Sequence, residues 1–278
     1  MKTKKNYREI SSEEYKSSSQ ENWGKDPCGA EYADPEYEKY SKEYFDDLER
    51  TRYSIQHWQL SEFESFDIEG KEVLEIGFGQ GTDHLMMARS GGIMHGIDLT
   101  EESKTITENR FSLYGYKSRL LTGDAEELPY KENTFDFVYS FGVLHHTPHI
   151  AKAIGEIHRV LKPGGKCYIA VYNKNSLFFW WSVFFADYIC RMKFLKMTLS
   201  QRISLIEYPN TNPNLYVKLH KRKELIEMFR DFENVVASTN HLSRTDLSLN
   251  ALFSDRFINR NSTRFGWYII IRADKGNA

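Results

Sequence analysis

The stretch VLEIGFGQGTD, residues 73–83, decides the fold. An apolar run over 73–76 leads straight into a turn with glycines at 77, 79 and 81, and a helix is predicted over 81–90. Glycines allow a tight turn and let the backbone approach a ligand that a Cβ atom would exclude. In an open α/β sheet this turn lies at the carboxyl ends of the strands, where ligands bind. The stretch therefore predicts a buried strand, a ligand-binding turn and a helix.

The same strand and helix rhythm continues beyond this stretch. Apolar runs without alternation are typical of parallel strands buried on both faces. Five such strands are predicted at 73–76, 93–97, 118–121, 135–140 and 167–171, with helices at 81–90, 101–114 and 150–161 between them. Five strands joined by crossover helices imply an α/β fold with an open, doubly wound sheet. A helix over 222–230 and strands over 235–237 and 267–271 follow.

The chain divides into five regions by composition. Residues 1–22 are rich in Ser, Lys and Glu with few apolar anchors, and this composition predicts a disordered tail. A helical cap is expected over 23–70, the core over 71–175, a helical insertion over 176–221, and the completion of the sheet over 222–278.

Two helices are predicted inside the cap. Asp34 and Pro35 have the pattern of a helix start, and the helix would carry Tyr37, Tyr40 and Tyr44 along one face. Ser61 and Glu64 have the spacing of a capping box, which predicts a second start. Arg50, Arg52 and Tyr53 lie just before the sheet and could reach a carboxylate or a phosphate, although solvated arginines are the commoner outcome.

Composition excludes several classes of function. The 37 Lys and Arg residues nearly balance 39 Asp and Glu residues, so no overall field favours nucleic acid. Cys28, Cys167 and Cys190 lie too far apart for a zinc motif, and no metal site is predicted. The N-terminus has no apolar signal region, and the longest apolar run, 177–186, is about half a membrane span. We therefore expect a cytoplasmic protein.

Acidic residues at later strand ends strengthen the ligand-binding interpretation. Asp98 follows Gly77 at the spacing expected of a residue that accepts ribose hydroxyls, and Asp124 and Ala125 follow the third strand. A dinucleotide fingerprint needs Gly-x-Gly-x-x-Gly, whereas the third glycine here comes one place early. Glu75 would disfavour a pyrophosphate and attract a cation. A nicotinamide-dependent oxidoreductase is therefore the weaker alternative to an enzyme that uses a cationic amino-acid cofactor.

Several motifs in order resemble the class I S-adenosylmethionine-dependent methyltransferases, and within them the small-molecule branch that includes the ubiquinone and menaquinone methyltransferases. The resemblance is carried by VLEIGFGQGTD (73–83), GIDLT (96–100), GDAEELPYKENTFDFVYSFGVLHHTPH (123–149) and EIHRVLKPGGKCYIAVYN (156–173). It implies a seven-stranded, mostly parallel sheet whose last strand is antiparallel, with S-adenosylmethionine as the cofactor.

The resemblance also implies roles for individual residues. Glu75, Gly77, Gly79 and Gly81, followed by Thr82 and Asp83 at the helix start, would line the methionine and ribose moieties. Asp98 would bind the ribose, Leu99 would pack on adenine, and Asp124 and Ala125 would contact the adenine edge. Ser140, Phe141 and Gly142 would lie beside the sulfonium. The implied reaction is methyl transfer by in-line displacement to a small or lipid-linked, partly apolar acceptor, and the alternative is a non-catalytic cofactor-binding subunit.

Candidates for catalysis and for acceptor binding lie outside the cofactor motifs. Methyl transfer is mostly positioning, and a base is needed only if the acceptor must lose a proton. His146, and after it His145, follow the fourth strand and could accept that proton. Acceptor-binding candidates are Tyr37, Tyr40, Tyr172, Asn173, His241 and Arg244.

The segment 177–197 is apolar nearly all round over its first turns, so something must cover it. Three interpretations stay open: a lid or pocket wall, a dimer interface, or shallow membrane contact with Arg191, Lys193 and Lys196 near headgroups. The oligomeric state is left open as well.

Overall fold

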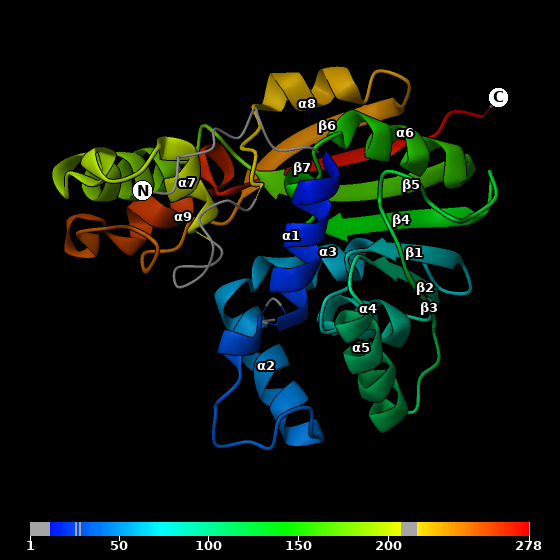
Figure 1. Cartoon of the computed structure of the whole chain (residues 1–278). Helices are drawn as coiled ribbons and strands as arrows, with labels where there is room; N and C mark the ends of the chain where they lie inside the picture. The colour runs from blue at the N-terminus through cyan, green and yellow to red at the C-terminus, as the bar shows by residue number, and fades with distance from the viewer. Residues whose placement is uncertain (1–11, 26, 28, 207–215, 278) are drawn as a thin grey trace.

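A seven-stranded sheet forms the centre of the computed structural model, which describes residues 12–25, 27, 29–206 and 216–277 (Figure 1). The strands are β1 (Glu72–Ile76), β2 (Ile93–Asp98), β3 (Arg119–Thr122), β4 (Phe135–Phe141), β5 (Leu161–Tyr172), β6 (Glu233–Asn240) and β7 (Tyr268–Asp274). Their order across the sheet is β3-β2-β1-β4-β5-β7-β6, and only β7 runs antiparallel to its neighbours. The predicted fold, including all seven strands and the antiparallel last strand, is confirmed.

Helices cover both faces of the sheet. On one face, α6 (Ile150–Val160) and α8 (Arg222–Met228) bury residues such as Ile154, Ile157 and Leu225 against the strands. On the other, α3 (Trp58–Ser65), α4 (Thr82–Arg89) and α5 (Glu101–Tyr114) bury Phe63, Leu85 and Phe111. In Figure 1, α6 and α8 lie at the top of the view and α4 and α5 at the bottom. The strands read as continuous apolar runs because both faces are buried.

The order of the strands fixes where a ligand can bind. The chain runs outward from β1 to β2 and β3, then returns to the other side of β1 with β4. A crevice opens at such a reversal, beyond the carboxyl ends of β1 and β4. The turn after β1 and the segment after β4 therefore meet there.

The N-terminal region departs from the prediction. Ser12–Lys25 form helix α1, so the predicted tail is wrong over 12–22, and residues 1–11 lie outside the described part. This helix lies in front of the carboxyl edge of the sheet (Figure 1). A short 3-10 turn, η2 (Ala30–Tyr32), follows. Cys28 lies outside the described residues.

Both predicted helix starts in the cap are misplaced. Asp34 instead closes a local turn in which its Oδ1 accepts from the Glu36 N–H (2.9 Å). Helix α2 (Lys42–Ile55) begins after Ser41, whose hydroxyl caps it, because Tyr40 has a φ of 67° and cannot continue a helix. Ser61 lies inside α3, where its hydroxyl donates to the Trp58 carbonyl.

A lobe follows β5, at the left of Figure 1. It contains the π-type helix η4 (Phe178–Cys190), the 3-10 turns η5 (Lys193–Leu195) and η6 (Asn250–Leu252), and helices α7 (Leu199–Ser204) and α9 (Asp255–Phe265). Residues 207–215 of the predicted insertion lie outside the described part. In the described residues no helix is long and apolar enough to cross a membrane.

Candidate cofactor and active site

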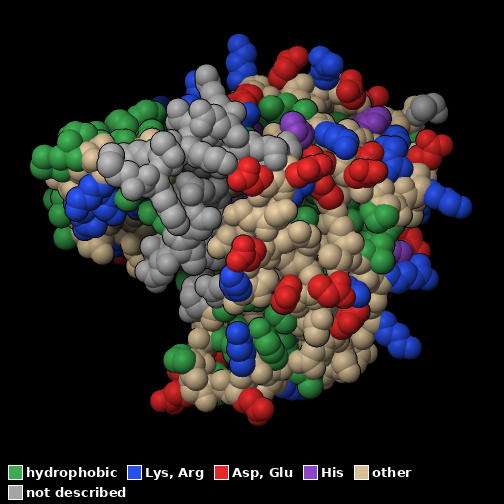
Figure 2. All heavy atoms as spheres, viewed as in Figure 1, with side chains coloured by type: hydrophobic (Ala, Val, Ile, Leu, Met, Phe, Trp, Pro, Cys, Tyr) green, Lys and Arg blue, Asp and Glu red, His purple; other side chains and the backbone are tan. Residues whose placement is uncertain are grey.

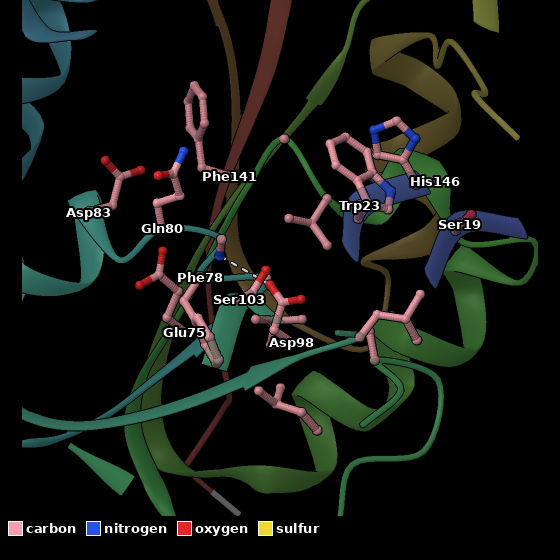
Figure 3. Close-up of a pocket in the computed structure, with 18 of the residues that line it drawn as sticks. Ser19, Trp23, Glu75, Phe78, Gln80, Asp83, Asp98, Ser103, Phe141 and His146 are labelled. Carbon is pink, nitrogen blue, oxygen red and sulfur yellow. Dashed lines mark hydrogen bonds between the residues drawn. The ribbon is translucent and has the colours of Figure 1, made fainter. Parts of the chain in front are cut away.

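A cavity lies at the carboxyl ends of β1, β2 and β4, where the topology places a binding crevice. Figure 3 shows side chains from the turn after β1 and from β2 on one side, and Trp23 and His146 on the other. Eleven of the predicted cofactor residues line it: Glu75, Gly77, Gly79, Thr82, Asp83, Asp98, Leu99, Asp124, Ala125, Phe141 and Gly142. Residues that are far apart in the sequence therefore converge on one hollow.

The three glycines of the turn after β1 have different structural roles. All have positive φ, which favours glycine. A Cβ on Gly77 would lie 2.2 Å from a methyl group of Val143, and a Cβ on Gly81 would lie 2.7 Å from Thr107. Nothing lies within 4 Å of a Cβ placed on Gly79, so this glycine faces open space. Gly77 and Gly81 permit close packing, and Gly79 leaves room at the cavity.

Asp98 ends β2 and connects two loops at the cavity. Its Oδ2 accepts from the Gly79 N–H and its Oδ1 from the Thr100 N–H, both at 3.0 Å. Burial raises the pKa of Asp98, and these hydrogen bonds oppose that effect. Thr100 caps α5 with its own hydroxyl, so Asp98 is not the cap of that helix. A carboxylate oxygen has more than one acceptor position, which leaves Asp98 able to accept from a ligand.

Glu75 lies deeper in the cavity and has a partner that the sequence did not indicate. Its Oε2 is 2.7 Å from Nδ1 of His84, and both side chains are almost wholly buried. Burial raises the pKa of Glu75 well above its usual value, and Asp83 adds to the rise. Burial also lowers the pKa of His84 to about 3. Burial therefore disfavours the charged form of each group, and a cation close to Glu75 would favour its carboxylate form.

Asp83 is the centre of a buried polar cluster. Arg52 lies 2.6 Å from its Oδ2, and the hydroxyls of Tyr53 and Tyr139 donate to it at 3.0 and 2.9 Å. Burial opposes the charge of Arg52, yet the attraction of Asp83 and the tyrosines raises the pKa of Arg52 overall. The Arg52 side chain also lines the cavity, and its Nε atom is buried without a partner among the described residues. Arg50, in contrast, is exposed.

His145 and His146 are placed very differently. His146 lines the cavity, and its Nδ1 lies 3.1 Å from the Tyr216 carbonyl. Because a carbonyl only accepts, Nδ1 carries the proton, and Nε2 is left as a buried acceptor without a described partner. Burial lowers the pKa of His146 to about 4. His145 does not line the cavity, because its ring is fully buried 3.7 Å from the Tyr172 ring centroid.

Helix α1 covers the cavity, which the prediction of a tail did not anticipate. Lys16 bridges Asp124 (2.5 Å) and Glu126 (2.7 Å), and the Gln20 amide donates to the Leu99 carbonyl (3.0 Å). The Trp23 ring meets the His146 ring edge to face, with centroids 5.2 Å apart. Lys16 and Trp23 line the cavity, together with Ser19, Gly29, Tyr32, Gln80 and Ser103, none of which was predicted as a site residue. Arg52, which the sequence offered as able to reach a carboxylate or a phosphate, lines it too.

Other predicted site residues do not line this cavity. Ser140 is buried with its hydroxyl on the Ile76 carbonyl, and Gly81 packs on Thr107. Tyr37 is exposed and Tyr40 packs on Tyr44.

The remaining acceptor-binding candidates also lie elsewhere. Tyr172 is stacked on Trp267, and the Asn173 amide donates to the Gly266 carbonyl. His241 lies 3.3 Å from Asp246, and Arg244 lies 3.4 Å from Asp255. Each of these four side chains makes a local structural contact, and none of them lines the cavity.

Comparison with known proteins shows what one part of the chain is similar to. The methyltransferase domain family matches residues 74–169, about a third of the chain. A fatty-acid O-methyltransferase of Mycolicibacterium smegmatis is 34% identical over 119 residues, which are 42% of this chain and 42% of that protein. A ubiquinone biosynthesis O-methyltransferase of Pseudomonas aeruginosa is 33% identical over 127 residues, 44% of this chain and 53% of that protein. The chain thus spans about half the length of the curated relatives it matches.

A solved structure shows the same fold at lower identity. A phosphoethanolamine N-methyltransferase of Haemonchus contortus, solved with phosphomonomethylethanolamine and S-adenosylhomocysteine, is 18% identical. Its TM-score is 0.53, over 80% of this chain and 53% of that one. At this identity the likeness extends to the fold alone.

Proposed function

We propose that the chain is a class I S-adenosylmethionine-dependent methyltransferase that transfers a methyl group to a small-molecule or lipid acceptor, because residues 74–169 match the methyltransferase domain family. The observation that carries this proposal is the convergence of the glycine turn, Asp98 and His146 on one cavity. The curated relatives include methyltransferases named for a fatty acid and for ubiquinone biosynthesis, and this supports an acceptor that is partly apolar.

The residues at the cavity fit this cofactor. Asp98 offers an acceptor for ribose hydroxyls, and the open space at Gly79 and Gly142 admits a ligand close to the backbone. Leu99, Asp124 and Ala125 line the part of the cavity beside β2 and β3, where an adenine would pack. Glu75 provides a group whose negative form a sulfonium would favour.

Arg52 would complete the site at the methionine end. Its buried Nε has no partner among the described residues, while its NH2 is bound to Asp83. A guanidinium can bind two carboxylates through different N–H groups. We assign the free N–H to the carboxylate of the cofactor's methionine moiety.

The protein's part in the reaction is positioning and proton transfer. When bound, the cofactor supplies an electrophilic methyl group on a sulfonium with a good leaving group. Holding an acceptor at near-attack geometry contributes about 7–11 kcal/mol, whereas a positioned base contributes about 10²–10⁴-fold. Nε2 of His146 would accept the proton of an acceptor hydroxyl or acid, because the Tyr216 carbonyl holds the other ring nitrogen as the donor.

The proposed acceptor also bears on where the protein acts. We propose a cytoplasmic protein that makes peripheral contact with a membrane through the segment 177–197, since a lipid acceptor resides in a bilayer. None of the residues from 177 to 197, all of which are described, lines the cavity, and this weakens the lid interpretation.

A labelled-methyl assay tests the proposal. The purified chain is incubated with S-adenosylmethionine carrying a tritiated methyl group and with lipid and aqueous fractions of a cell extract. We expect label in a lipid-soluble product, and none with Asp98→Ala. Calorimetric binding of S-adenosylhomocysteine without label in any fraction would favour a non-catalytic subunit. A melting temperature raised by NAD and not by S-adenosylhomocysteine would favour an oxidoreductase.

A further inference from the structure

The lobe formed by η4, η5, η6 and α9 carries a concentration of exposed large apolar side chains. Single exposed apolar residues are common, but a contiguous group marks an interaction surface. The group consists of Trp180, Phe185, Ile189, Met192, Phe194, Leu195, Leu249, Leu252 and Phe257, with exposed fractions between 38% and 69%. Figure 2 shows the apolar surface at the left end of the molecule, over the lobe of Figure 1, and we call it the apolar patch.

The apolar patch is the outer side of a well-anchored element. The inner side of η4 is fixed to the 242–258 segment: Trp181 Nε1 donates to the Ser248 carbonyl (2.7 Å), and the Ser182 hydroxyl accepts from the Ser248 N–H (2.9 Å). Trp181 also packs with Phe253, while Phe179 and Val183 are buried. Helix η4 is therefore well packed on its inner side, and its outward apolar side chains are not exposed because of poor packing.

Charge around the apolar patch is strongly positive, although the chain as a whole has a net charge of −2. Residues 177–206 and 249–266 contain seven Lys or Arg and two Asp residues. One of the acids, Asp187, is buried and pairs with Arg191, Lys193 and Arg202, so it offers no negative surface. Arg256, Arg260 and Arg264 recur every four residues along α9 and are all exposed.

We propose that the apolar patch and its basic rim dock the protein on an anionic lipid bilayer. Aromatic and aliphatic side chains that project between basic residues match the interface of a membrane, where apolar groups insert and cations meet headgroups. Anionic lipid attracts Lys and Arg side chains that lie near its surface. A second copy of the chain fits less well, because a dimer through this face would bring two positive surfaces together. The docking itself does not depend on the proposed function. Only its biological purpose, access to a lipid acceptor, rests on that function.

Flotation with vesicles tests the docking directly and needs no acceptor. The full chain is mixed with vesicles of phosphatidylcholine alone or of phosphatidylcholine with phosphatidylglycerol, at low and high salt. We expect binding to the anionic vesicles and its loss at high salt, because salt screens exposed charges. The absence of binding to anionic vesicles at low salt, or equal binding to both vesicle types, would overturn the proposal.

Paired variants separate the two contributions. Phe185→Ser with Leu195→Ser removes apolar contact, and we expect at least about tenfold weaker binding to anionic vesicles. Arg256→Glu with Arg260→Glu should weaken it by a similar factor. Ile226→Ser with Val236→Ser, and Lys117→Glu with Arg119→Glu, alter exposed residues elsewhere and should leave binding unchanged. Equal losses in the test and control variants would contradict the assignment.

Two further measurements keep the result interpretable. Affinity for S-adenosylhomocysteine, measured by calorimetry, should be the same in all four variants, which also shows that they are folded. Vesicle binding without any methyl transfer would leave the docking intact and count against the proposed function alone. A different outcome would assign the face to a second copy of the chain and overturn the proposal. In that outcome the wild type does not bind vesicles, it sediments as a dimer, and Phe185→Ser with Leu195→Ser dissociates the dimer.

Discussion

The guanidinium of Arg52 lies 2.6 Å from the carboxylate of Asp83, and it uses only part of its hydrogen-bonding capacity there. Asp83 has two further donors, Tyr53 and Tyr139, whereas the Arg52 Nε atom has no partner among the described residues. A buried donor without a partner costs about 1–3 kcal/mol. Arg52 is therefore held firmly at the cavity with one N–H available for an anion.

Substitution Arg52→Gln should weaken binding of S-adenosylhomocysteine, which has the methionine carboxylate, by roughly 10- to 100-fold, the range for a hydrogen bond to a charged group. Binding of methylthioadenosine, which lacks that carboxylate, should change little. Calorimetry with both ligands measures the ratio of their affinities, which does not depend on overall stability. An unchanged ratio would contradict the assignment.

Two other variants serve as controls for the Arg52 experiment. Arg50→Gln alters an exposed arginine on the same helix and should leave both affinities unchanged. Arg52→Gln combined with Asp83→Asn removes both charges, so that no buried carboxylate is left unpaired. The double variant should show the same affinity ratio as Arg52→Gln alone.

Asp98 and Thr100 provide a second matched pair. Asp98→Ala removes the proposed ribose acceptor, and we expect S-adenosylhomocysteine to bind roughly 10- to 100-fold more weakly. Thr100→Ala removes the cap of α5 and should reduce the free energy of unfolding by about 1 kcal/mol with little change in affinity. Calorimetry and chemical unfolding measure the two effects. Equal affinity losses in both variants would mean that Asp98 acts through the loop and not on the ligand.

The sheet and the turn after β1 could be predicted because their signals are local. Buried strands read as apolar runs, and the turn needs glycines at positions with positive φ. Helix α1 could not be predicted, since its contacts are made with distant parts of the chain. Lys16 reaches acids more than a hundred residues away, and little in 12–25 other than Tyr15 and Trp23 is apolar.

The side chains around the site were predictable only in part. Asp98 ends β2 and His146 lies in the segment after β4, so their place at the sheet edge follows from topology. Tyr172 and Asn173 also lie at a strand end, but they contact Trp267 and Gly266 in place of the cavity. No sequence pattern marks His84 as the partner of Glu75, because that contact depends on how α4 packs on the sheet.

His146→Gln should lower the rate of label transfer by roughly 10²–10⁴-fold if the imidazole is the base, with affinity for S-adenosylhomocysteine unchanged. His145→Gln should leave the rate near that of the wild type, because the ring does not reach the cavity. The pKa of about 4 predicts that wild-type activity falls with protonation of His146 only near pH 4. A rate–pH profile for each protein checks this, and an equal effect of both substitutions would remove His146 from the mechanism.

Lys16→Ala should speed the release of S-adenosylhomocysteine. The Lys16 side chain links α1 to the half-buried Asp124 and the buried Glu126. A partly exposed ion pair contributes about 0.2–1 kcal/mol, so dissociation about 1.4- to fivefold faster is expected. Stopped-flow displacement measures it, with Lys25→Ala, an exposed pair on the same helix, as the control. Equal rates in the wild type and Lys16→Ala would show that α1 does not retain the ligand.

Acid should destabilise the fold through its buried histidines. Burial lowers the pKa of His145 well below its usual value, and that of His220 to about 4. In the unfolded chain a histidine titrates near pH 6.5, so below this pH the unfolded state binds more protons and the folded state loses stability. Each such histidine contributes a slope of about 1.4 kcal/mol per pH unit, down to its folded-state pKa.

His145→Phe, which keeps a ring against Tyr172, should reduce this slope between about pH 6.5 and 5 in urea unfolding. His57→Gln alters an exposed histidine and should not. The same slope in His145→Phe as in the wild type would mean that His145 becomes protonated in the folded protein.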